Sequence, residues 1–362
     1  MARRVLQLLG PSAGGIRAHV AELARRLPAH GWQPSVICSH DVMAGIGPQH
    51  GDLDVPPMWN VTAYRPARRR LAEMVEGHDV LHVHGLKAAM VAVGLTDRPP
   101  MVLTVHNLVA GTQPWAVRPV LQRLESHLVA RADHLIVISD EIEQRFADVI
   151  GADRRSFVLP VSPPRTVGRT RDEVRREHGI AADAPLVTIV ARHHRQKNLT
   201  MFLDAVAVAV AAVPGLRVLM VGDGPDRADL ERHRSSLGLD GIVVMTGQRP
   251  NPVDEMHAAD VVGLSSDWEG SPLVVAECLA VGRPLVATAV GTVTRHLVDG
   301  VSARITPVGA APAFAAAMIE LLSDPVRAAA IAAAGHRVGA VVFDPDSLVD
   351  GVARVYDGLV AP

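Results

Sequence analysis

VVGLSSDWEGSPLVVAE, residues 261–277, contains the transition that decides the fold of the second half of the chain. Residues 261–264 are apolar and short, which is typical of one buried parallel strand. Pro272 opens the next apolar segment, and proline is favoured in the first turn of a helix. The pattern therefore predicts a strand, a polar loop and a helix, with the loop at the carboxyl end of the strand.

The start of this predicted helix offers groups that bind anions. Its first backbone amides lack intrahelical partners, and the helix dipole adds partial positive charge. Together these features can hold a diphosphate without any side chain. The residues of this turn are Gly270, Ser271, Pro272, Leu273 and Val274.

Two carboxylates flank the turn. Glu269 lies in the loop, where a sugar ring would lie, and Glu277 lies one to two turns into the helix, where it could accept hydrogen bonds from a ribose. The alternative interpretation is a solvated loop carboxylate and an ordinary carboxylate on the helix surface.

Apolar runs of four to six residues alternate with helical patterns along the whole chain, which predicts two doubly wound α/β domains. The expected strands are 5–9, 35–38, 80–83, 102–105, 135–138 and 157–159 in the first half, and 186–190, 218–221, 242–245, 261–264 and 285–287 in the second. The proline-rich stretch 160–166 is expected to link residues 1–163 to residues 167–344, and a helix at about 345–362 to return to the first domain. Two such sheets, facing each other, would form a cleft at their carboxyl edges.

The composition excludes several classes of protein. The 362 residues are 48% hydrophobic and 20% charged, and the formal net charge of -2 does not favour a nucleic-acid partner. The two cysteines, Cys38 and Cys278, each lie in an apolar segment, so we expect no disulfide and a cytoplasmic location. The first apolar run stops at Gly10, and no segment approaches the ~18 uninterrupted apolar residues of a membrane span.

Two features of the first half fall at predicted strand ends. The turn 10–16 contains Gly14 and Gly15, which would let a phosphate or sugar approach the start of the next helix, although the spacing is not G-x-G-x-x-G and also fits a tight turn. His106 follows the strand 102–105, where its imidazole could donate to a sugar hydroxyl or a phosphate oxygen, or be structural. His82 and His84 share a strand face, but the sequence places no third ligand, so we expect no metal site.

Basic and glycine-rich turns follow strands of the second half. Arg192 and Lys197 could neutralise a leaving diphosphate, although a basic loop is more often solvated. Gly222 and Gly224 lie in a strand-end turn, and Arg249 follows a later strand. Such loops could contact the edge of a nucleobase, or be ordinary turns.

Taken together, these motifs resemble those of glycosyltransferase family 4, the retaining enzymes with the two-domain GT-B fold. The resemblance covers nearly the whole chain and implies that Arg192 and Lys197 bind the donor diphosphate, with Glu277 on the ribose and Glu269 near the donor sugar. It also implies that Gly15 and His106 contribute from the first domain. Family members generally work without a metal or another cofactor, which agrees with the lack of a strand-end Asp-x-Asp.

The chain departs from the family pattern after the strand 285–287. Many members have a second glycine and then a glutamate where this chain has Thr292 and Arg295. This loop lies near the phosphate and sugar end of the family's site, so the change bears on the identity of the sugar.

The expected reaction is transfer of a hexose from a UDP- or GDP-sugar to an acceptor hydroxyl, with the anomeric configuration retained. The alternatives are a sugar-nucleotide epimerase of the same fold, and a non-catalytic nucleotide-binding or nicotinamide-dependent protein. The acceptor could be a small molecule, a glycan or a lipid-linked sugar. The basic residues around 65–70 and the segment 115–129 could hold the first domain on an anionic membrane, or be a solvated face and a core helix.

Overall fold

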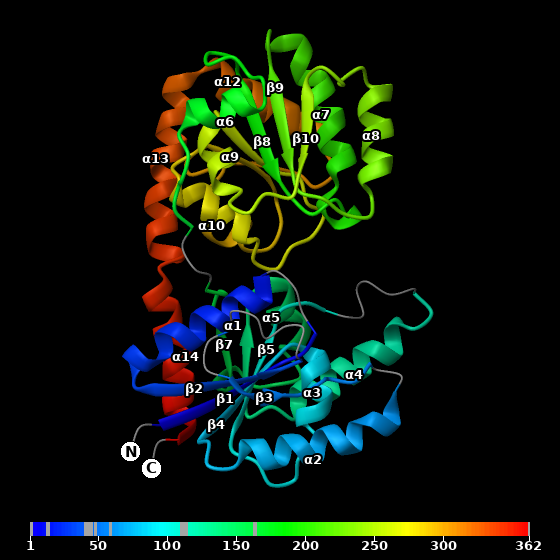
Figure 1. Cartoon of the computed structure of the whole chain (residues 1–362), viewed down its shortest axis with the longest axis vertical. Helices are drawn as coiled ribbons and strands as arrows, with labels where there is room; N and C mark the ends of the chain where they lie inside the picture. The colour runs from blue at the N-terminus through cyan, green and yellow to red at the C-terminus, as the bar shows by residue number, and fades with distance from the viewer. Residues whose placement is uncertain are drawn as a thin grey trace. The chain divides into compact units, whose positions relative to one another are not determined.

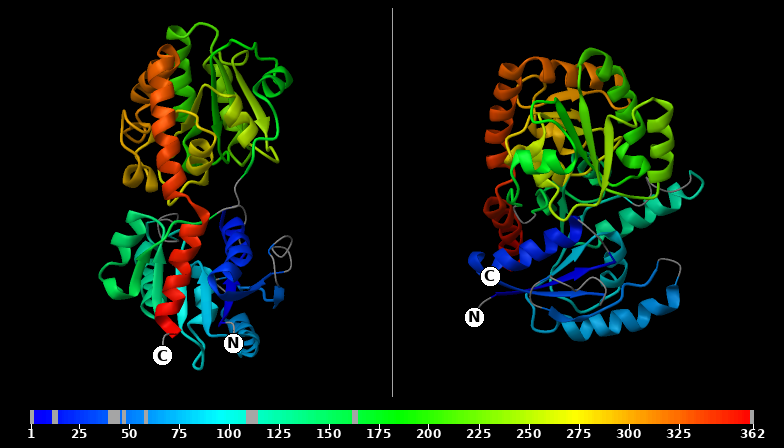
Figure 2. Two further views of the ribbon diagram at one scale, coloured as in Figure 1. Left: turned by 90° about the vertical axis from the view of Figure 1, so that its left-hand side faces the viewer. Right: turned by 45° about the horizontal axis from the view of Figure 1, so that its top comes forward.

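A computed structural model describes residues 3–11, 15–39, 46, 49–57, 60–108, 115–161 and 165–360. The chain divides into two compact units, Met1–Pro163 with Asp344–Pro362 and Pro164–Phe343 (Figure 1). Each unit is a parallel sheet with helices on both faces (Figure 2). This arrangement confirms the expected class of two doubly wound α/β sheets.

The first unit contains a seven-stranded sheet in the order β3-β2-β1-β4-β5-β6-β7. Its strands are β1 (Arg3–Leu9), β2 (Trp32–Cys38), β3 (Gln49–Asp52), β4 (Val80–His84), β5 (Met101–Val105), β6 (His134–Val137) and β7 (Arg155–Phe157). Its α-helices are α1 (Gly15–Arg26), α2 (Tyr64–Val75), α3 (Leu86–Ala92), α4 (Arg118–Ala130), α5 (Asp140–Phe146) and α14 (Pro345–Val360).

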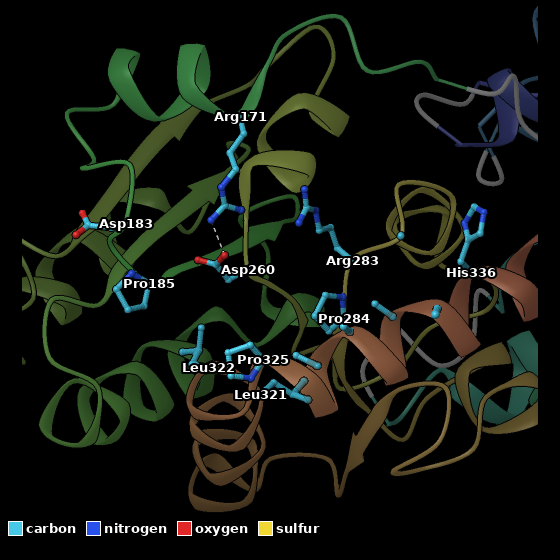
Figure 3. Close-up of a pocket in the computed structure, with 15 residues that line it drawn as sticks. Arg171, Asp183, Pro185, Asp260, Arg283, Pro284, Leu321, Leu322, Pro325 and His336 are labelled. Carbon is cyan, nitrogen blue, oxygen red and sulfur yellow. Dashed lines mark hydrogen bonds and ion pairs between the residues drawn. The ribbon is translucent and has the colours of Figure 1, made fainter.

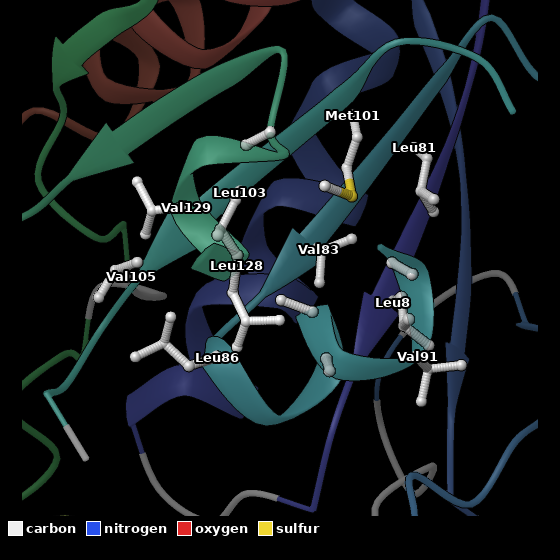
Figure 4. Close-up of a cluster of buried hydrophobic side chains, with 14 of the residues drawn as sticks. Leu8, Leu81, Val83, Leu86, Val91, Met101, Leu103, Val105, Leu128 and Val129 are labelled. Carbon is white, nitrogen blue, oxygen red and sulfur yellow. The ribbon is translucent and has the colours of Figure 1, made fainter. Parts of the chain in front are cut away.

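Alternate residues of these strands build two cores. Leu81, Leu103 and their neighbours pack with Leu86 and Leu128 of the helices on one face (Figure 4). The residues one position away in the strands, such as Val80 and Val102, face the other core, which α14 covers. This period of two is what a sheet buried on both faces requires, because successive side chains of a strand point to opposite sides.

Helix α14 belongs to the first unit although α13 (Pro325–Val342), which precedes it, belongs to the second. Asp344 separates the two helices, and its Oδ2 accepts a 2.8 Å hydrogen bond from the Ser347 amide at the start of α14. In the described part of the chain, the stretch Pro325–Val360 is long and apolar enough, by length and composition alone, to span a membrane. Its buried residues, Ile331 and Tyr356 among them, pack into the cores of the two units.

The second unit contains a six-stranded sheet in the order β10-β9-β8-β11-β12-β13. Its strands are β8 (Leu186–Val190), β9 (Arg217–Val221), β10 (Val243–Gly247), β11 (Val261–Leu264), β12 (Leu285–Thr288) and β13 (Arg304–Thr306). Its remaining α-helices are α6 (Arg171–Glu177), α7 (Leu199–Ala212), α8 (Arg227–Ser236), α9 (Val253–Ala258), α10 (Leu273–Ala280), α11 (Thr292–His296) and α12 (Ala311–Ser323).

The strand order reverses direction between β8 and β11, which lie side by side in the sheet. At such a reversal the loops that follow the two strands diverge to opposite faces, and ligands of doubly wound sheets bind in the crevice that this leaves. The two loops here are residues 191–198 after β8 and residues 265–272 after β11.

Candidate active site

The loops after β8 and β11 are joined by direct hydrogen bonds. The Asp267 amide donates to the Gln196 carbonyl at 2.9 Å, and Gln196 Nε2 donates to the Trp268 carbonyl at 2.9 Å. Asn198 Nδ2 donates to Asp267 Oδ1 at 2.6 Å. The Arg195 guanidinium lies 5.7 Å from the centre of the Trp268 ring. The two loops at the reversal point therefore form one connected surface.

An ion pair between Lys197 and Glu269 lies inside this surface. The Lys197 ammonium contacts Glu269 Oε1, which also accepts a 2.6 Å hydrogen bond from the Ser266 hydroxyl. The Glu269 side chain is 7% exposed and that of Lys197 is 21% exposed. The structure thus brings together two residues that lie 72 positions apart and were predicted separately. Ser266 is a partner that sequence reasoning missed.

Arg192 and His193, which are neighbours in the first loop, differ in their surroundings. Arg192 is exposed and forms no hydrogen bond or ion pair with any residue that the structure describes. His193 is fully buried, its ring nitrogens have no partner within the described ranges, and burial lowers its pKa. Arg192 is therefore an exposed cation, without a partner among the described residues, in the same loop as Lys197.

Glycines bring the loop after β9 against the loop after β8. A Cβ atom at Gly222 would lie 1.9 Å from the Ala191 carbonyl oxygen, and one at Gly224 would lie 2.3 Å from the His193 carbonyl oxygen. Gly222 also has a φ of +131°, which L-residues rarely adopt. Both predicted glycines are thus required by close approach of two backbones.

The loop after β12 fixes the backbone of the predicted carboxylate turn. The Thr288 hydroxyl donates to the Ser266 carbonyl at 2.6 Å, and the Thr292 amide donates to the Gly270 carbonyl at 3.1 Å. Gly291 has a φ of +50°, and a Cβ there would lie 2.3 Å from the Gly270 carbonyl oxygen. Arg295, at the position where the chain departs from the family pattern, is exposed in the last turn of α11.

Helix α10 begins at Leu273, and Pro272 precedes it as the N-cap residue with extended backbone angles. The expectation that Pro272 lies in the first helical turn is therefore wrong by one position. The Pro272 carbonyl accepts a hydrogen bond from the Val275 amide at 3.0 Å. Leu273 and Val274 are the first two residues of the helix, where amides have no intrahelical acceptor.

Glu277 lies in the second turn of α10, with its side chain 18% exposed. Its Oε1 is 3.2 Å from Arg165 Nε, a contact that sequence reasoning missed because Arg165 falls in the interdomain segment. Burial raises the pKa of the Glu277 carboxyl, and the charge of Arg165 opposes this shift.

Arg249 has acidic partners within its own unit. Its Nη2 donates to Glu177 Oε1 at 2.6 Å, and its Nε is 3.3 Å from Oε1 of the buried Glu255. His178 Nε2 lies 3.1 Å from the same Nη2. These contacts place Arg249 in an ion-pair network that extends to Arg169.

In the first unit, His106 follows β5 and lies among buried histidines. Its Nε2 is 3.4 Å from His84 Nδ1, and burial lowers the pKa of both residues well below the usual range. His19 on α1 joins them, and ligand atoms of the three side chains lie within 4.8 Å of one another. By proximity these imidazoles could hold a metal ion, which the sequence did not indicate because His19 is distant in the chain.

The predicted glycines of the first turn are only partly described. Gly15 begins α1 and is exposed, whereas Gly14 lies outside the described residues. His82, two positions before His84, is bonded through Nδ1 to the Tyr356 hydroxyl at 2.5 Å and through Nε2 to the Thr104 hydroxyl at 2.7 Å.

A separate cavity of about 580 Å³ lies in the second unit, lined by Arg171, Asp260, Arg283 and an apolar floor that includes Leu321 (Figure 3). Asp260 and Pro284 immediately precede β11 and β12, so the cavity is at the amino edge of the sheet. The candidate loops are at the opposite, carboxyl edge.

Comparisons with known proteins agree with this geometry. The model of Glycosyltransferase Family 4 matches residues 13–161, and that of Glycosyl transferases group 1 matches residues 170–338. D-inositol 3-phosphate glycosyltransferase from Geodermatophilus obscurus is 30% identical over 95% of this chain and 84% of its own length. Alpha-D-kanosaminyltransferase from Streptomyces kanamyceticus is 26% identical over 80% of this chain and 79% of its own.

Among solved structures, Anabaena Alr3699/HepE in complex with UDP aligns with a TM-score of 0.84 at 18% identity, covering 98% of this chain and 100% of that one. Sucrose-phosphate synthase from Thermosynechococcus elongatus aligns with a TM-score of 0.82 at 22% identity, covering 99% of both chains. The fold and the sequence matches define a glycosyltransferase with the GT-B fold. Within that class, the chain belongs to the group 1 glycosyltransferases of family 4.

The close approach at Gly291 gives a test of how the loops are held. Gly291→Ala should destabilise the second unit and displace the backbone of residues 269–270, because its Cβ would overlap two carbonyl oxygens. Gly282→Ala is the matched control, since Gly282 also has a positive φ but nothing lies within 4 Å of its Cβ position. In chemical unfolding, the free energy of unfolding of the control should fall by about 1 kcal/mol. That of Gly291→Ala should fall by clearly more. Equal decreases in the free energy of unfolding would show that the backbone of residues 269–270 can move to accommodate the added Cβ at little cost.

Proposed function

We propose that the protein is a retaining hexosyltransferase that uses a UDP- or GDP-sugar as donor and an acceptor hydroxyl. The observation that carries this proposal is the Lys197–Glu269 pair at the reversal point of the second sheet, in the two loops that also contain Arg192 and lead into α10. Glu277 provides a carboxylate in the second turn of that helix. The cations and the helix amides suit the diphosphate of a sugar nucleotide, Glu269 suits the sugar, and Glu277 suits the ribose.

The relatives support a sugar-nucleotide donor. The Mycolicibacterium smegmatis relative, 28% identical over 74% of this chain, is named as a GDP-mannose-dependent mannosyltransferase. HepE has been crystallised with UDP-glucose. These two names support both nucleotides as candidates for this chain.

In the proposed mechanism, negative charge develops on the departing diphosphate. Arg192, Lys197 and the amides at the start of α10 would stabilise that charge, and preorganised groups of this kind supply a large share of enzymatic rate enhancement. Glu269, oriented by the hydrogen bond from the Ser266 hydroxyl, holds the ammonium of Lys197 in place before substrate binds. The resemblance implies that a departing phosphate oxygen takes the acceptor proton, and that no metal is needed because the side-chain cations neutralise the diphosphate.

The function is tested by measuring transfer and binding in the presence of EDTA. Calorimetry with UDP, GDP and their common sugars should show binding of one nucleotide series, and the product should keep the anomeric configuration of the donor. Failure of every sugar nucleotide to bind would reject the proposal. Free epimerised sugar nucleotide, formed without an acceptor, would favour the epimerase alternative.

A surface of the first unit supports a membrane-bound acceptor. Trp115, in the turn before α4, and Val120, in its first turn, are 83% and 67% exposed, and Arg123 on the same helix is exposed. On α2, Arg70 pairs with Asp52 at 2.8 Å, and Arg68 Nη2 donates to the Met90 carbonyl at 3.0 Å. We infer that the start of α4 contacts an anionic lipid surface. Trp115→Ala should reduce flotation with anionic vesicles, and unchanged flotation would remove this surface from the proposal.

Lys197→Ala should lower the turnover rate. The activation free energy should rise by roughly 2 to 4 kcal/mol, because the lost cation acts where leaving-group charge develops. Arg195→Ala is the matched control, since Arg195 is an exposed cation in the same loop whose guanidinium lies over the Trp268 ring and not on the Glu269 carboxylate. Rates at saturating donor distinguish the two variants. A Lys197→Ala enzyme with the parent rate would show that Lys197 only supports the loop.

Glu277→Gln should weaken binding of the intact nucleotide by about 1.5 to 3 kcal/mol, through loss of a charged hydrogen-bond acceptor for the ribose. Because burial raises the pKa of Glu277, the carboxylate takes up a proton at a higher pH than an ordinary glutamate. Donor affinity should therefore fall as the pH falls through this raised pKa, and Glu277→Gln should abolish that dependence. The same calorimetry with a 2′-deoxy donor tests the contact with the ribose. If Glu277→Gln reduced the affinity for the ribose donor and the 2′-deoxy donor equally, Glu277 would not contact the ribose 2′-hydroxyl.

A further inference from the structure

The cavity at the amino edge of the second sheet has a polar wall and an apolar floor (Figure 3). Its volume of about 580 Å³ is within the range of roughly 300 to 1,000 Å³ that is usual for small-molecule sites. All of its lining residues belong to the second unit, and the candidate active site is at the opposite edge of the sheet. A molecule in this cavity would therefore not compete with a donor bound at the candidate active site.

The polar wall contains a carboxylate whose oxygens are already bonded. Asp260 Oδ1 is 2.6 Å from Arg171 Nη2, and its Oδ2 accepts hydrogen bonds from Arg175 Nη2 at 3.0 Å and from the Leu186 amide at 2.9 Å. The Arg175 side chain is 1% exposed, and its Nη1 donates to three backbone carbonyls. Both oxygens of Asp260 are thus engaged by donors other than Arg283.

Arg283 contributes a cation to this wall without such a partner. Figure 3 shows its side chain extending into the cavity towards Arg171 and Asp260. Its Nε is buried and has no hydrogen-bond partner in the part of the chain that the structure describes. Burial and the charge of Arg171 lower the pKa of Arg283, and the charge of Asp260 opposes this shift. Because a guanidinium stays charged in proteins and a buried polar group without a partner is costly, an anion at this place would be favourable.

The charge of the wall differs between its two ends. Asp183 also lines the cavity, but it is exposed, and Figure 3 shows it on the far side of Asp260 from Arg283. At the other end three arginines surround the single carboxylate of Asp260, so the charge there is positive. Guanidinium groups bind carboxylates and phosphates through two parallel hydrogen bonds, and this end of the cavity therefore suits such a head group.

The floor of the cavity is formed by the last turn of α12 and one face of α13. Leu321 and Leu322 contribute from α12. The face of α13 that lines the cavity, here called the alanine face, consists of Pro325, Ala328, Ala329, Ala332 and Ala333. These side chains are short, so they leave space above the helix and offer no hydrogen-bonding group. The floor therefore suits an alkyl chain, which gains by leaving water.

We propose that this cavity binds an anionic amphiphile, with its carboxylate or phosphate on Arg283 and its alkyl chain on the alanine face of α13. The site is separate from the donor site, and the inference does not depend on the proposed function. A small anion would leave the floor uncovered, and a neutral apolar molecule would leave Arg283 without a partner. Both parts of the amphiphile are therefore needed for full affinity.

Calorimetry with the full chain tests the site with octanoate and octyl phosphate. Acetate and 1-octanol are the comparison compounds, because each has only one of the two parts. At least one amphiphile should bind about tenfold or more tightly than both comparison compounds, and the tighter of the two identifies the head group. Saturating UDP or GDP should leave this affinity unchanged.

Three results of this calorimetry would overturn the proposal. The first is failure of both amphiphiles to bind. The second is binding of acetate or 1-octanol as tight as that of the amphiphiles, since one part would then be sufficient. The third is displacement of the amphiphile by UDP or GDP, which would place it in the donor site.

Matched variants locate the bound amphiphile. Arg283→Met removes the charge but keeps a long side chain, and it should weaken binding about tenfold or more. Arg337→Met is its control, because Arg337 is an exposed arginine of α13 outside the cavity lining. Ala329→Leu should also weaken binding, since the larger side chain fills the space above the floor. Ala330→Leu is its control, because Ala330 is the next exposed residue of α13 and does not line the cavity.

Thermal unfolding without ligand shows whether each variant is folded. Ala329 is exposed, so Ala329→Leu provides a test even where Arg283→Met does not fold. Parent affinity in a folded Arg283→Met or Ala329→Leu variant would overturn the proposal. Equal weakening by a variant and its control would do the same, because it would show that the amphiphile associates with the protein at other places.

Discussion

The Lys197–Glu269 ion pair is the interaction around which the second unit's loops are arranged. Removing two charges from water is costly, so such a pair contributes little to stability unless further bonds satisfy its atoms. Here the Ser266 hydroxyl bonds the same carboxylate, and the Ser265 hydroxyl donates to the Lys197 carbonyl at 2.7 Å. The Ser265–Lys197 bond and the ion pair itself require the two loops to stay in register, whereas the Ser266 bond orients the carboxylate within its own loop. The pair therefore specifies the shape of the site more than it stabilises the fold, and it keeps a cation at the place where the proposed chemistry needs one.

Much of the fold could be predicted because buried parallel strands are near-continuous apolar runs that are easily recognised in the sequence. The runs at 186–190 and 261–264 coincide with β8 and β11, since both faces of these strands are covered and every residue must be small and apolar or well satisfied. Two of the strands at the edges of the sheets are shorter and have no clear apolar run. β3, with the sequence QHGD, and β13, with only three residues, were missed. β2 begins at Trp32, three residues earlier than expected. Pro34 can lie inside this strand because the pairing with β3 starts only at Val36, so β3 does not need an amide from residue 34.

Local backbone requirements could be predicted from the sequence, whereas contacts with partners that only the fold brings close could not. Glycine at 222 and 224 is explained by backbone contacts at fixed strand ends. The partners of Arg249 were not visible, because Glu177 and Glu255 lie on helices distant in sequence. His19 is hidden for the same reason: nothing in the helix 15–26 indicates that it meets two other histidines. Spacing along the chain thus identifies groups that share a turn, whereas partners brought together by packing need the three-dimensional structure.

The assignment of α14 to the first unit has a consequence for the order in which the chain acquires structure during synthesis. Val349 and Tyr356 close the core over Val5 and Val80, which are made more than 260 residues earlier. The second unit is continuous in sequence and ends at Phe343. Domains generally fold as units as they leave the ribosome. The second unit can therefore complete its core first, while one face of the first sheet stays open until the last helix has emerged, so the N-terminal half of this protein is the later of the two to finish folding.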